Sequence, residues 1–504
     1  MTKLKKIMAV LLCTSLITVG FSGCGKKEEK SASNSGGASD LYIYNSKGES
    51  AKEFEKIAQA YEKETGVKVK VFSIGSGNDH MATLRSEMNT KQQPDIFTVQ
   101  SVSELREWTD SEKAMDFATA EGLTEEFKAL ADGVNKKLRL TTNGKDNYGI
   151  PYCIEGYGYI VDKKMLIDIF NLEFVDTLLE DLRECDYKEW EQFVKALGEY
   201  ISDGKATSVK INGNTYKMAK KKTALTKKLT GVFAIAADQS GKWTYSDHMI
   251  NVAMNEVFET AADAKAAKPD DVKRLRGPFI TYAKALNLKT SYMAGANGPV
   301  KRGEDMISSS NNYDAAIQNM AKSRAVFLKN GIWAYNSIAA ENPEVADRLT
   351  FLPIKMPFVQ SEIRVKGYTV GGMNSTIPVF VPMYYAINND ADEAHKKAAQ
   401  DFLVWLNTSE EGKKFIVETL AFVPYNVDAA TVTGKTSLAN SLIEYVRRGN
   451  TLTDPYHGAP NNWSSNMVGT KIYESYLTKE NWTQQDYEDI ADYAIRKWIE
   501  AIED

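Results

Sequence analysis

The stretch LYIYNSKGESAKEFEKIAQAYEKETGVKVKV, residues 41–71, predicts a strand, a helix and a second strand. Residues 41–44 favour strand structure, and apolar residues in 51–64 recur at i, i+3, i+4 and i+7, the spacing of one helical face. Three valines in 67–71 alternate with lysines, which indicates a strand with one exposed face. Two strands joined by such a helix pair in parallel through a right-handed crossover. We therefore expect an α/β fold.

Further along the chain, similar patterns predict several more elements. A third strand is expected at 95–99, and a helix capped by Asp186 at 187–201. Asn212-Gly213 indicates the turn of a small hairpin, and the C-terminal residues form another amphipathic helix. A body of about 460 residues exceeds what one hydrophobic core supports, so two or more lobes are expected.

The N-terminal region has the pattern of a secretion leader followed by a tether. Three lysines precede an apolar run at 7–19, and small residues precede Cys24 as in lipoprotein processing. We expect residues 1–23 to be a signal peptide, Cys24 to be lipidated and residues 24–40 to form a flexible tether. A plain secretory leader and an uncleaved membrane anchor are the alternatives.

Charge and cysteine content restrict the partners and the chemistry. The formal net charge is −5, and it becomes −8 without the leader's three lysines, which argues against nucleic acid as a partner. No later stretch is apolar for the roughly 18 residues of a membrane span. Only Cys153 and Cys185 lie in the body, too few for a disulfide framework, and the sequence leaves their pairing open.

Catalytic and metal-binding motifs are not found. The four histidines have no metal-ligand spacing, so neither a metal nor a cofactor is expected. A carboxylate pair for glycoside hydrolysis stays open, because 67 acidic residues always include pairs that can meet in space. The sequence therefore favours binding over catalysis.

Polar and aromatic residues at particular places suggest a binding site. Polar side chains follow the predicted strands, at the edge where open α/β sheets bind ligands. Aromatic residues stand beside glycines, where they are expected to be exposed in a cleft, and their rings can stack on the C–H faces of sugars. The candidate ligand-binding residues are Asn45, Ser46, Glu49, Gln100, Ser101, Tyr152, Glu155, Tyr157, Trp333, Tyr335, Tyr384 and Trp463.

Ordered motifs resemble one family. LYIYNSKGES with ETGVKVKV, QQPDIFTVQ, YGIPYCIEGYGYIVDKKML, RAVFLKNGIWAYNSI and IPVFVPMYYAINND occur in the family's order between about residues 40 and 425. The chain is similar to the extracellular solute-binding lipoproteins of bacterial carbohydrate ABC importers, of the maltose-binding-protein-like type. It departs from them in an apparent insertion at 205–245 and in Met320-Ala-Lys-Ser323 before the N-G-x-W strand.

The resemblance implies a periplasmic-binding-protein-like (type II) fold of two lobes, with a hinge and a ligand cleft between them. Lobe 1 would comprise 41–148 and 376–425, and lobe 2 would comprise 149–375 and 426–504. Glu155 would accept hydrogen bonds from sugar hydroxyls, Trp333 would stack on a sugar ring with Tyr335 beside it, and Tyr384 would lie near the hinge.

The same resemblance implies a monomer on the outer face of the cell membrane. It would be held by its N-terminal lipid, and it would capture a sugar or oligosaccharide and deliver it to ABC permease subunits. The alternatives are a secreted glycoside hydrolase that uses a carboxylate pair, an adhesin or scaffold, and a binding protein for a non-sugar solute.

Overall fold

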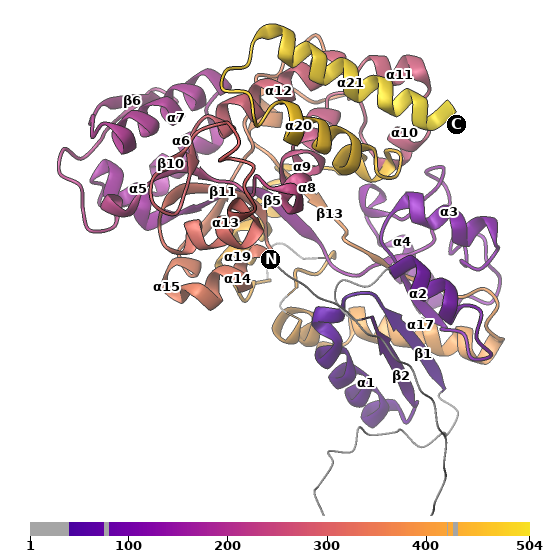
Figure 1. Cartoon of the computed structure of the whole chain (residues 1–504). Coiled ribbons are helices and arrows are strands. Elements are labelled where there is room, and N and C mark those ends of the chain that lie inside the picture. The colour runs from indigo at the N-terminus through magenta and orange to yellow at the C-terminus, as the bar shows by residue number, and fades with distance from the viewer. Residues whose placement is uncertain (1–39, 75–79, 421, 427–431, 504) are drawn as a thin grey trace, which may run out of the picture. The chain divides into compact units, whose positions relative to one another are not determined.

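The structure is a computed structural model that describes residues 40–74, 80–420, 422–426 and 432–503 (Figure 1). The predicted leader and the lipidation site Cys24 lie outside these residues, as does nearly all of the tether. In the part of the chain that is described, no helix is long and apolar enough to cross a membrane.

The first sheet contains the predicted strand–helix–strand unit. The strand at 41–45 pairs in parallel with those at 69–73 and 96–99, which confirms the predicted parallel pairing, whereas the strand at 384–387 is antiparallel to both of its neighbours. The order of the sheet is β2 (Val69–Ser73), β1 (Leu41–Asn45), β3 (Ile96–Val99), β14 (Tyr384–Ile387) and β4 (Ile150–Pro151).

The helix between β1 and β2 forms where the apolar spacing places it. α1 (Ala51–Thr65) buries Phe54, Ile57, Ala58 and Tyr61 on one face and ends at Gly66, whose φ of +81° suits glycine. The other helices around the first sheet are α2 (His80–Glu87), α3 (Val102–Asp110), α4 (Glu125–Asp132), α17 (Glu393–Thr408) and α18 (Glu410–Lys414), and hydrophobic clusters lie on both faces of the sheet.

The second sheet is larger and mixed. β5 (Glu155–Asp162) runs through its centre and is buried along its whole length. The order is β10 (Pro299–Val300), β9 (Met293–Ala294), β8 (Gly231–Ala234), β11 (Ala325–Gly331), β5, β13 (Ile377–Phe380) and β15 (Thr451–Leu452), with β12 (Leu349–Leu352) also paired to β5.

Helices cover the second sheet, and the C-terminal helix runs beside α12 (Figure 1). α7 begins after the predicted cap Asp186 and ends at Ser202, and it buries Trp190, Phe193, Val194 and Leu197. The helices are α5 (Lys163–Phe170), α6 (Asp176–Glu184), α7 (Tyr187–Ser202), α8 (Lys242–Tyr245), α9 (Asp247–Met254), α10 (Ala261–Lys265), α11 (Pro269–Lys273), α12 (Arg276–Thr290), α13 (Tyr313–Ala321), α14 (Ala334–Glu341), α15 (Pro343–Ala346), α16 (Val370–Asn374), α19 (Ser437–Arg448), α20 (Thr470–Ser475) and α21 (Gln484–Glu503).

The apparent insertion at 205–245 has two different parts. The predicted hairpin is confirmed: β6 (Ser208–Ile211) pairs with β7 (Asn214–Lys217), and both residues of the Asn212-Gly213 turn have positive φ. The later residues form β8, which lies inside the second sheet between β9 and β11. The hairpin is therefore separate from the second sheet, whereas β8 is one of its strands.

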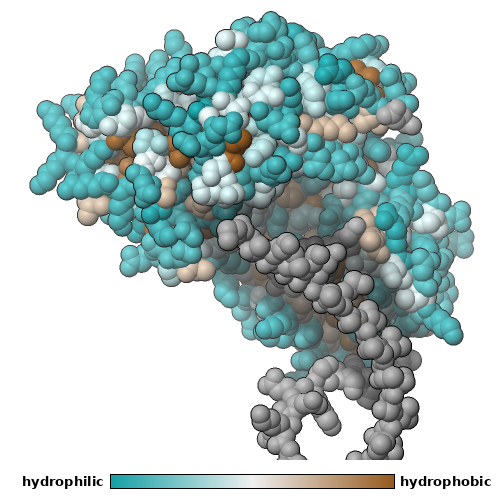
Figure 2. All heavy atoms as spheres, in the orientation of Figure 1, coloured by the Kyte–Doolittle hydropathy of each residue, from teal (hydrophilic) through white to brown (hydrophobic). Residues whose placement is uncertain are grey.

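Cys153 and Cys185 are both buried free thiols, so the open question of their pairing is answered. Cys153 belongs to a cluster under the first sheet, and Cys185 belongs to one under the second. The face in Figure 2 is largely hydrophilic, with apolar residues in small scattered spots. Ordinary packing thus holds the described residues together without a bond between these two thiols.

Candidate functional site

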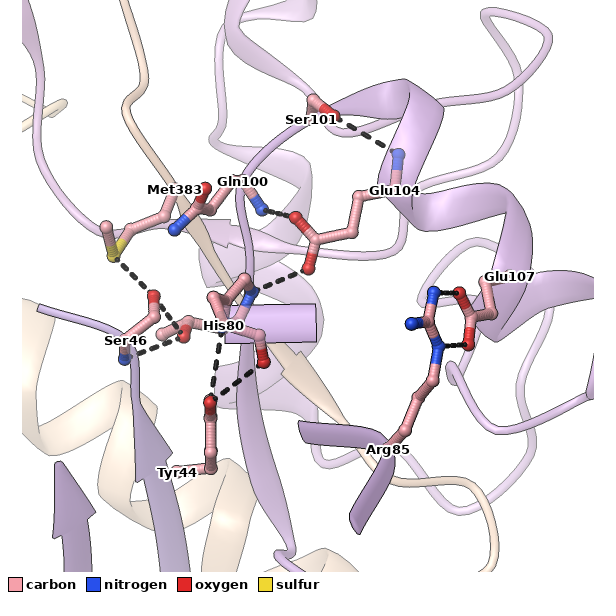
Figure 3. Close-up of polar contacts among 10 residues, drawn as sticks. Tyr44, Ser46, His80, Arg85, Gln100, Ser101, Glu104, Glu107 and Met383 are labelled. Carbon is pink, nitrogen blue, oxygen red and sulfur yellow. Dashed lines mark hydrogen bonds and ion pairs between the residues drawn. The ribbon is translucent and has the colours of Figure 1, made fainter. Parts of the chain in front are cut away.

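The polar side chains after β1 and β3 meet at one edge of the first sheet, as predicted (Figure 3). The Ser46 backbone N–H donates to Thr98 Oγ1 at 3.1 Å, and the Thr98 hydroxyl donates to Ser46 Oγ at 2.8 Å. Ser46 Oγ in turn lies 3.5 Å from the sulfur of Met383, just before β14. Ser46 therefore links the end of β1 to β3 and to the residue before β14.

A second part of this edge centres on Glu104 in the first turn of α3. Its carboxylate accepts from the Gln100 backbone N–H at 2.8 Å and lies 2.7 Å from His80 Nε2. The Glu104 backbone N–H donates to Ser101 Oγ, so Ser101 is the N-cap of α3. The Gln100 side chain is exposed, and Figure 3 shows it on the side where Ser46 and Met383 lie. We call Ser46, Thr98, Gln100, Ser101, Glu104 and His80 the strand-end edge.

Asn45 and Glu155 are already bonded inside the protein. The Asn45 amide donates to Ser73 Oγ and to the Lys47 carbonyl, both at 3.0 Å, and its side chain is fully buried. Glu155, at the start of β5, forms an ion pair with Lys47 at 3.0 Å. A sugar hydroxyl would therefore compete with Lys47 for the Glu155 carboxylate. The side chain of Glu49 lies outside what the structure describes.

A cavity of about 510 Å³ is lined by residues from both sheets. Gln100 and Ser101 follow β3, and Tyr384 begins β14, so three predicted residues meet here. Phe380 at the end of β13 and His457 contribute from the second sheet's side. The cavity volume is within the range of small-molecule sites.

Ion pairs set the electrostatics of this cavity. His457 Nδ1 lies 3.0 Å from Asp454 Oδ2; burial opposes the charging of the imidazole, but the carboxylate outweighs burial and raises the pKa of His457. Lys137 and Glu259 pair at 2.8 Å, and this hydrogen bond raises the pKa of Lys137. The charged groups named here thus largely neutralise one another, which suits an uncharged polar ligand.

Trp333 takes its position from the glycine two residues before it. A side chain at Gly331 would begin only 2.0 Å from the Trp333 ring, so the glycine lets the indole fold back over the end of β11. The ring stays partly exposed. The glycine of the N-G-x-W pattern therefore allows the Trp333 ring to lie at the end of β11 with part of its surface exposed.

Trp333 belongs to a group of rings that sequence reasoning largely missed. Trp243, His248 and Phe380 lie 6.1, 5.4 and 6.2 Å from Trp333 between ring centroids, and each is partly exposed. Phe380 also lines the cavity and lies 5.7 Å from His457. We call Trp243, His248, Trp333 and Phe380 the aromatic cluster. The cluster and the cavity are thus continuous through Phe380.

Trp463 is buried, contrary to the expectation of a ring exposed in a cleft. Its side chain has no exposed area, its Nε1–H donates to the Ala494 carbonyl at 2.7 Å, and its ring packs 4.6 Å from Trp498. The neighbouring Gly458 does not border open space, because a Cβ there would meet the Ala261 carbonyl at 1.8 Å. The glycine permits close backbone packing instead.

Three other predicted aromatic residues also have internal partners. Tyr152 and Tyr157 are 2% and 0% exposed; Tyr152 stacks on Tyr385, and the Tyr157 hydroxyl accepts from Asn251. Tyr335 is partly exposed, but its hydroxyl donates to Asp347. Tyr152 and Tyr157 are therefore core residues, and the prediction that their rings are exposed in a cleft is wrong.

Two α/β lobes, a neutralised polar cavity lined from both sheets and exposed rings beside it define a solute-binding protein of the two-lobe type. The chain belongs to the family of bacterial extracellular solute-binding proteins, whose family model matches residues 56–440. Members of this family bind solutes and are not enzymes as a class.

Solved structures share the fold. The apo form of RafE from Streptococcus pneumoniae is 16% identical, with a TM-score of 0.60 over 92% of this chain and 99% of that chain. A family 1 extracellular solute-binding protein from Bifidobacterium longum subsp. infantis is 13% identical, with a TM-score of 0.57 over 92% and 99%. The putative binding protein MsmE from Bacillus subtilis is 17% identical, with a TM-score of 0.58 over 92% and 97%.

These identities are low, so the similarities establish the fold and the two-lobe architecture alone. No curated protein matches the sequence of this chain.

Proposed function

We propose that this protein captures a sugar or short oligosaccharide between its lobes and delivers it to the permease of an ABC importer. The observation that carries the proposal is the aromatic cluster, whose rings are partly exposed and which reaches the cavity through Phe380. Such rings stack on sugar C–H faces, while polar groups bond the hydroxyl rim. Family membership supports the binding role. Two proteins of the same fold are described as RafE in complex with raffinose and as a chitin oligosaccharide binding protein.

Within this function, the predicted residues take different roles. Trp333 stacks on a sugar ring, and Gln100, Ser101 and Tyr384 line the ligand's path. Glu155 accepts a hydrogen bond from a sugar hydroxyl after its ion pair with Lys47 opens. Ser46 and Asn45 shape the floor from the first lobe, and Tyr335 flanks Trp333.

Strand pairing supports a proposal for the limits of the lobes. β4 pairs with β14 and β13 pairs with β5, so the chain crosses between the sheets near 151–155 and again near 380–384. We propose lobe 1 at 41–151 and 384–425 and lobe 2 at 155–380 and 432–503, where the sequence predicts 41–148 and 376–425 for lobe 1 and 149–375 and 426–504 for lobe 2. These crossings are the proposed hinge.

We further propose a monomer anchored outside the cell membrane by lipid on Cys24. The apolar run, the small residues before the cysteine and the polar tether support this. Growth of expressing cells with a radiolabelled fatty acid should label the protein, and Cys24→Ala should abolish the label and release the protein from the membrane. A Cys24→Ala protein that keeps its label would refute this anchor.

Binding is tested by titration calorimetry of the purified protein with raffinose, galactose, acarbose and chitin oligosaccharides. At least one should bind saturably, and incubation should release no reducing ends. If none of them binds, the sugar-binding function is wrong; if a bound sugar is cleaved, the protein is a glycoside hydrolase.

A further inference from the structure

His248 lies at the centre of the aromatic cluster although no pattern in the sequence marks it. It is the second residue of α9, and its ring stacks on Tyr157 with centroids 4.1 Å apart and planes 15° from parallel. Trp243 meets it edge-on at 5.1 Å, and Trp333 lies 5.4 Å away. The imidazole is therefore fixed in orientation by rings on several sides.

Lys329 lies beneath this imidazole. It directly follows the apolar residues 325–328 of β11 and is 2% exposed, an unusual place for a lysine. Its Nζ lies 2.5 Å from His248 Nδ1, and no carboxylate forms an ion pair with it among the described residues. It also lies over the ring faces of Tyr157 and Trp243, at 5.1 and 5.8 Å from their centroids, where a cation is stabilised.

This contact determines which nitrogen of His248 carries the hydrogen. When Lys329 carries its proton, the ammonium group has only hydrogens to donate, so Nδ1 accepts and the hydrogen of the neutral ring stands on Nε2. Burial first, and then the charge of Lys329, hold the pKa of His248 well below its usual range, which keeps the ring neutral. Burial and nearby Lys289 also lower the pKa of Lys329, so this tautomer is expected at a pH low enough to keep the amine protonated.

The Nε2–H of this ring is available to a ligand. The His248 side chain is partly exposed, and no hydrogen bond to its Nε2 occurs within the described part of the chain. A donor placed beside an indole face is the arrangement that holds a sugar ring and one of its oxygens together.

We propose that His248 donates its Nε2–H to an oxygen of the bound sugar and that Lys329 is the positioning residue that fixes this tautomer. The inference rests on the proposed function for its ligand. The assignment of the tautomer does not depend on any ligand.

The first test therefore uses the ligand-free protein. Nitrogen-15 NMR of imidazole-labelled protein at pH 6, with His248 assigned by its loss in His248→Gln, should show the hydrogen on Nε2 and an unprotonated Nδ1. In Lys329→Met, whose side chain packs in similar space, this preference should be lost. A hydrogen on Nδ1 in the unmodified protein would overturn the role of Lys329.

The second test compares two substitutions at His248 by calorimetry with the tightest-binding sugar among raffinose, galactose, acarbose and chitin oligosaccharides. Glutamine can place an amide N–H near the position of Nε2, whereas phenylalanine keeps the ring and removes the donor. We expect His248→Phe to weaken binding by about tenfold and His248→Gln by about threefold or less. Thermal unfolding of both variants serves as the control for folding.

Equal affinities of the two variants would overturn the donor role. If no probe binds even to the unmodified protein, the donor role falls together with the proposed function. The Nε2–H tautomer would then still establish that Lys329 positions His248.

Discussion

The strand-end edge of the first lobe and the aromatic cluster of the second differ in how far their groups are already satisfied. At the edge, Glu104 bonds to His80, to Gln100 and through its backbone to Ser101. In the cluster, Trp333 and Trp243 present partly exposed faces. A ligand can bond to such a network only if some of the network's internal hydrogen bonds break, whereas it can stack on an exposed ring without breaking any. We infer that the edge supplies shape and the cluster supplies most of the affinity.

The largest expected effect is on stability, and it distinguishes a buried tryptophan ring from a partly exposed one. Trp463→Ala removes a fully buried ring and its hydrogen bond to Ala494, so the free energy of unfolding should fall by about 3–5 kcal/mol. Urea denaturation measures this loss, and Trp333→Ala is the matched control because its ring is partly exposed. Equal losses in the two variants would mean that Trp333 is a core residue too.

The next effect concerns affinity. Trp333→Ala should weaken sugar binding by about 1–3 kcal/mol, the contribution of a stacked aromatic contact, while the protein stays folded. Calorimetry with the tightest-binding sugar of the panel measures it. Unchanged affinity would remove Trp333 from the site and undo the contrast between the two regions.

At the strand-end edge, we expect a substitution to lower stability more than affinity. Glu104→Ala deprives the Gln100 backbone N–H and His80 of their acceptor, so stability should fall by about 1–3 kcal/mol. Affinity for the sugar should change much less than in Trp333→Ala. A larger loss of affinity than of stability would show that the edge, not the cluster, holds the ligand.

The smallest expected effect concerns Glu256, a buried carboxylate outside the strand-end edge. Glu256 has no exposed area, and burial, followed by the charge of Glu362, raises its pKa to about 8 from 4.5. The folded chain thus keeps a proton that the unfolded chain releases. Stability should therefore fall as pH rises from 4.5 to 8, by about 1.4 kcal/mol per pH unit.

Denaturation of Glu256→Gln and of the unmodified protein at pH 6 and pH 7 measures this slope. The substitution should remove it, because the amide does not titrate. The same dependence in both proteins would assign the slope to other groups.

Local patterns predicted the elements that local forces determine. The stripe of Phe54, Ile57, Ala58 and Tyr61 and the Asn212-Gly213 turn depend on neighbours within a few residues, and both were correct. The strand-end edge was also predictable in outline, because parallel strands bring their carboxyl ends together.

Contacts between distant residues explain what the sequence could not reveal. A glycine beside Trp463 looks like one beside Trp333, but only the structure shows that Gly458 packs on the Ala261 carbonyl. The proposed role of His248 depends on its contact with Lys329, which lies 81 residues later in the sequence. A lysine inside an apolar strand was a signal that could have directed attention to it.

The most direct test of the account is a crystal structure with the tightest-binding sugar of the panel. The account predicts electron density for a sugar between the lobes, with one ring flat against the Trp333 indole and the cavity beside Phe380 occupied. A sugar bound away from the aromatic cluster, with Trp333 untouched, would contradict it.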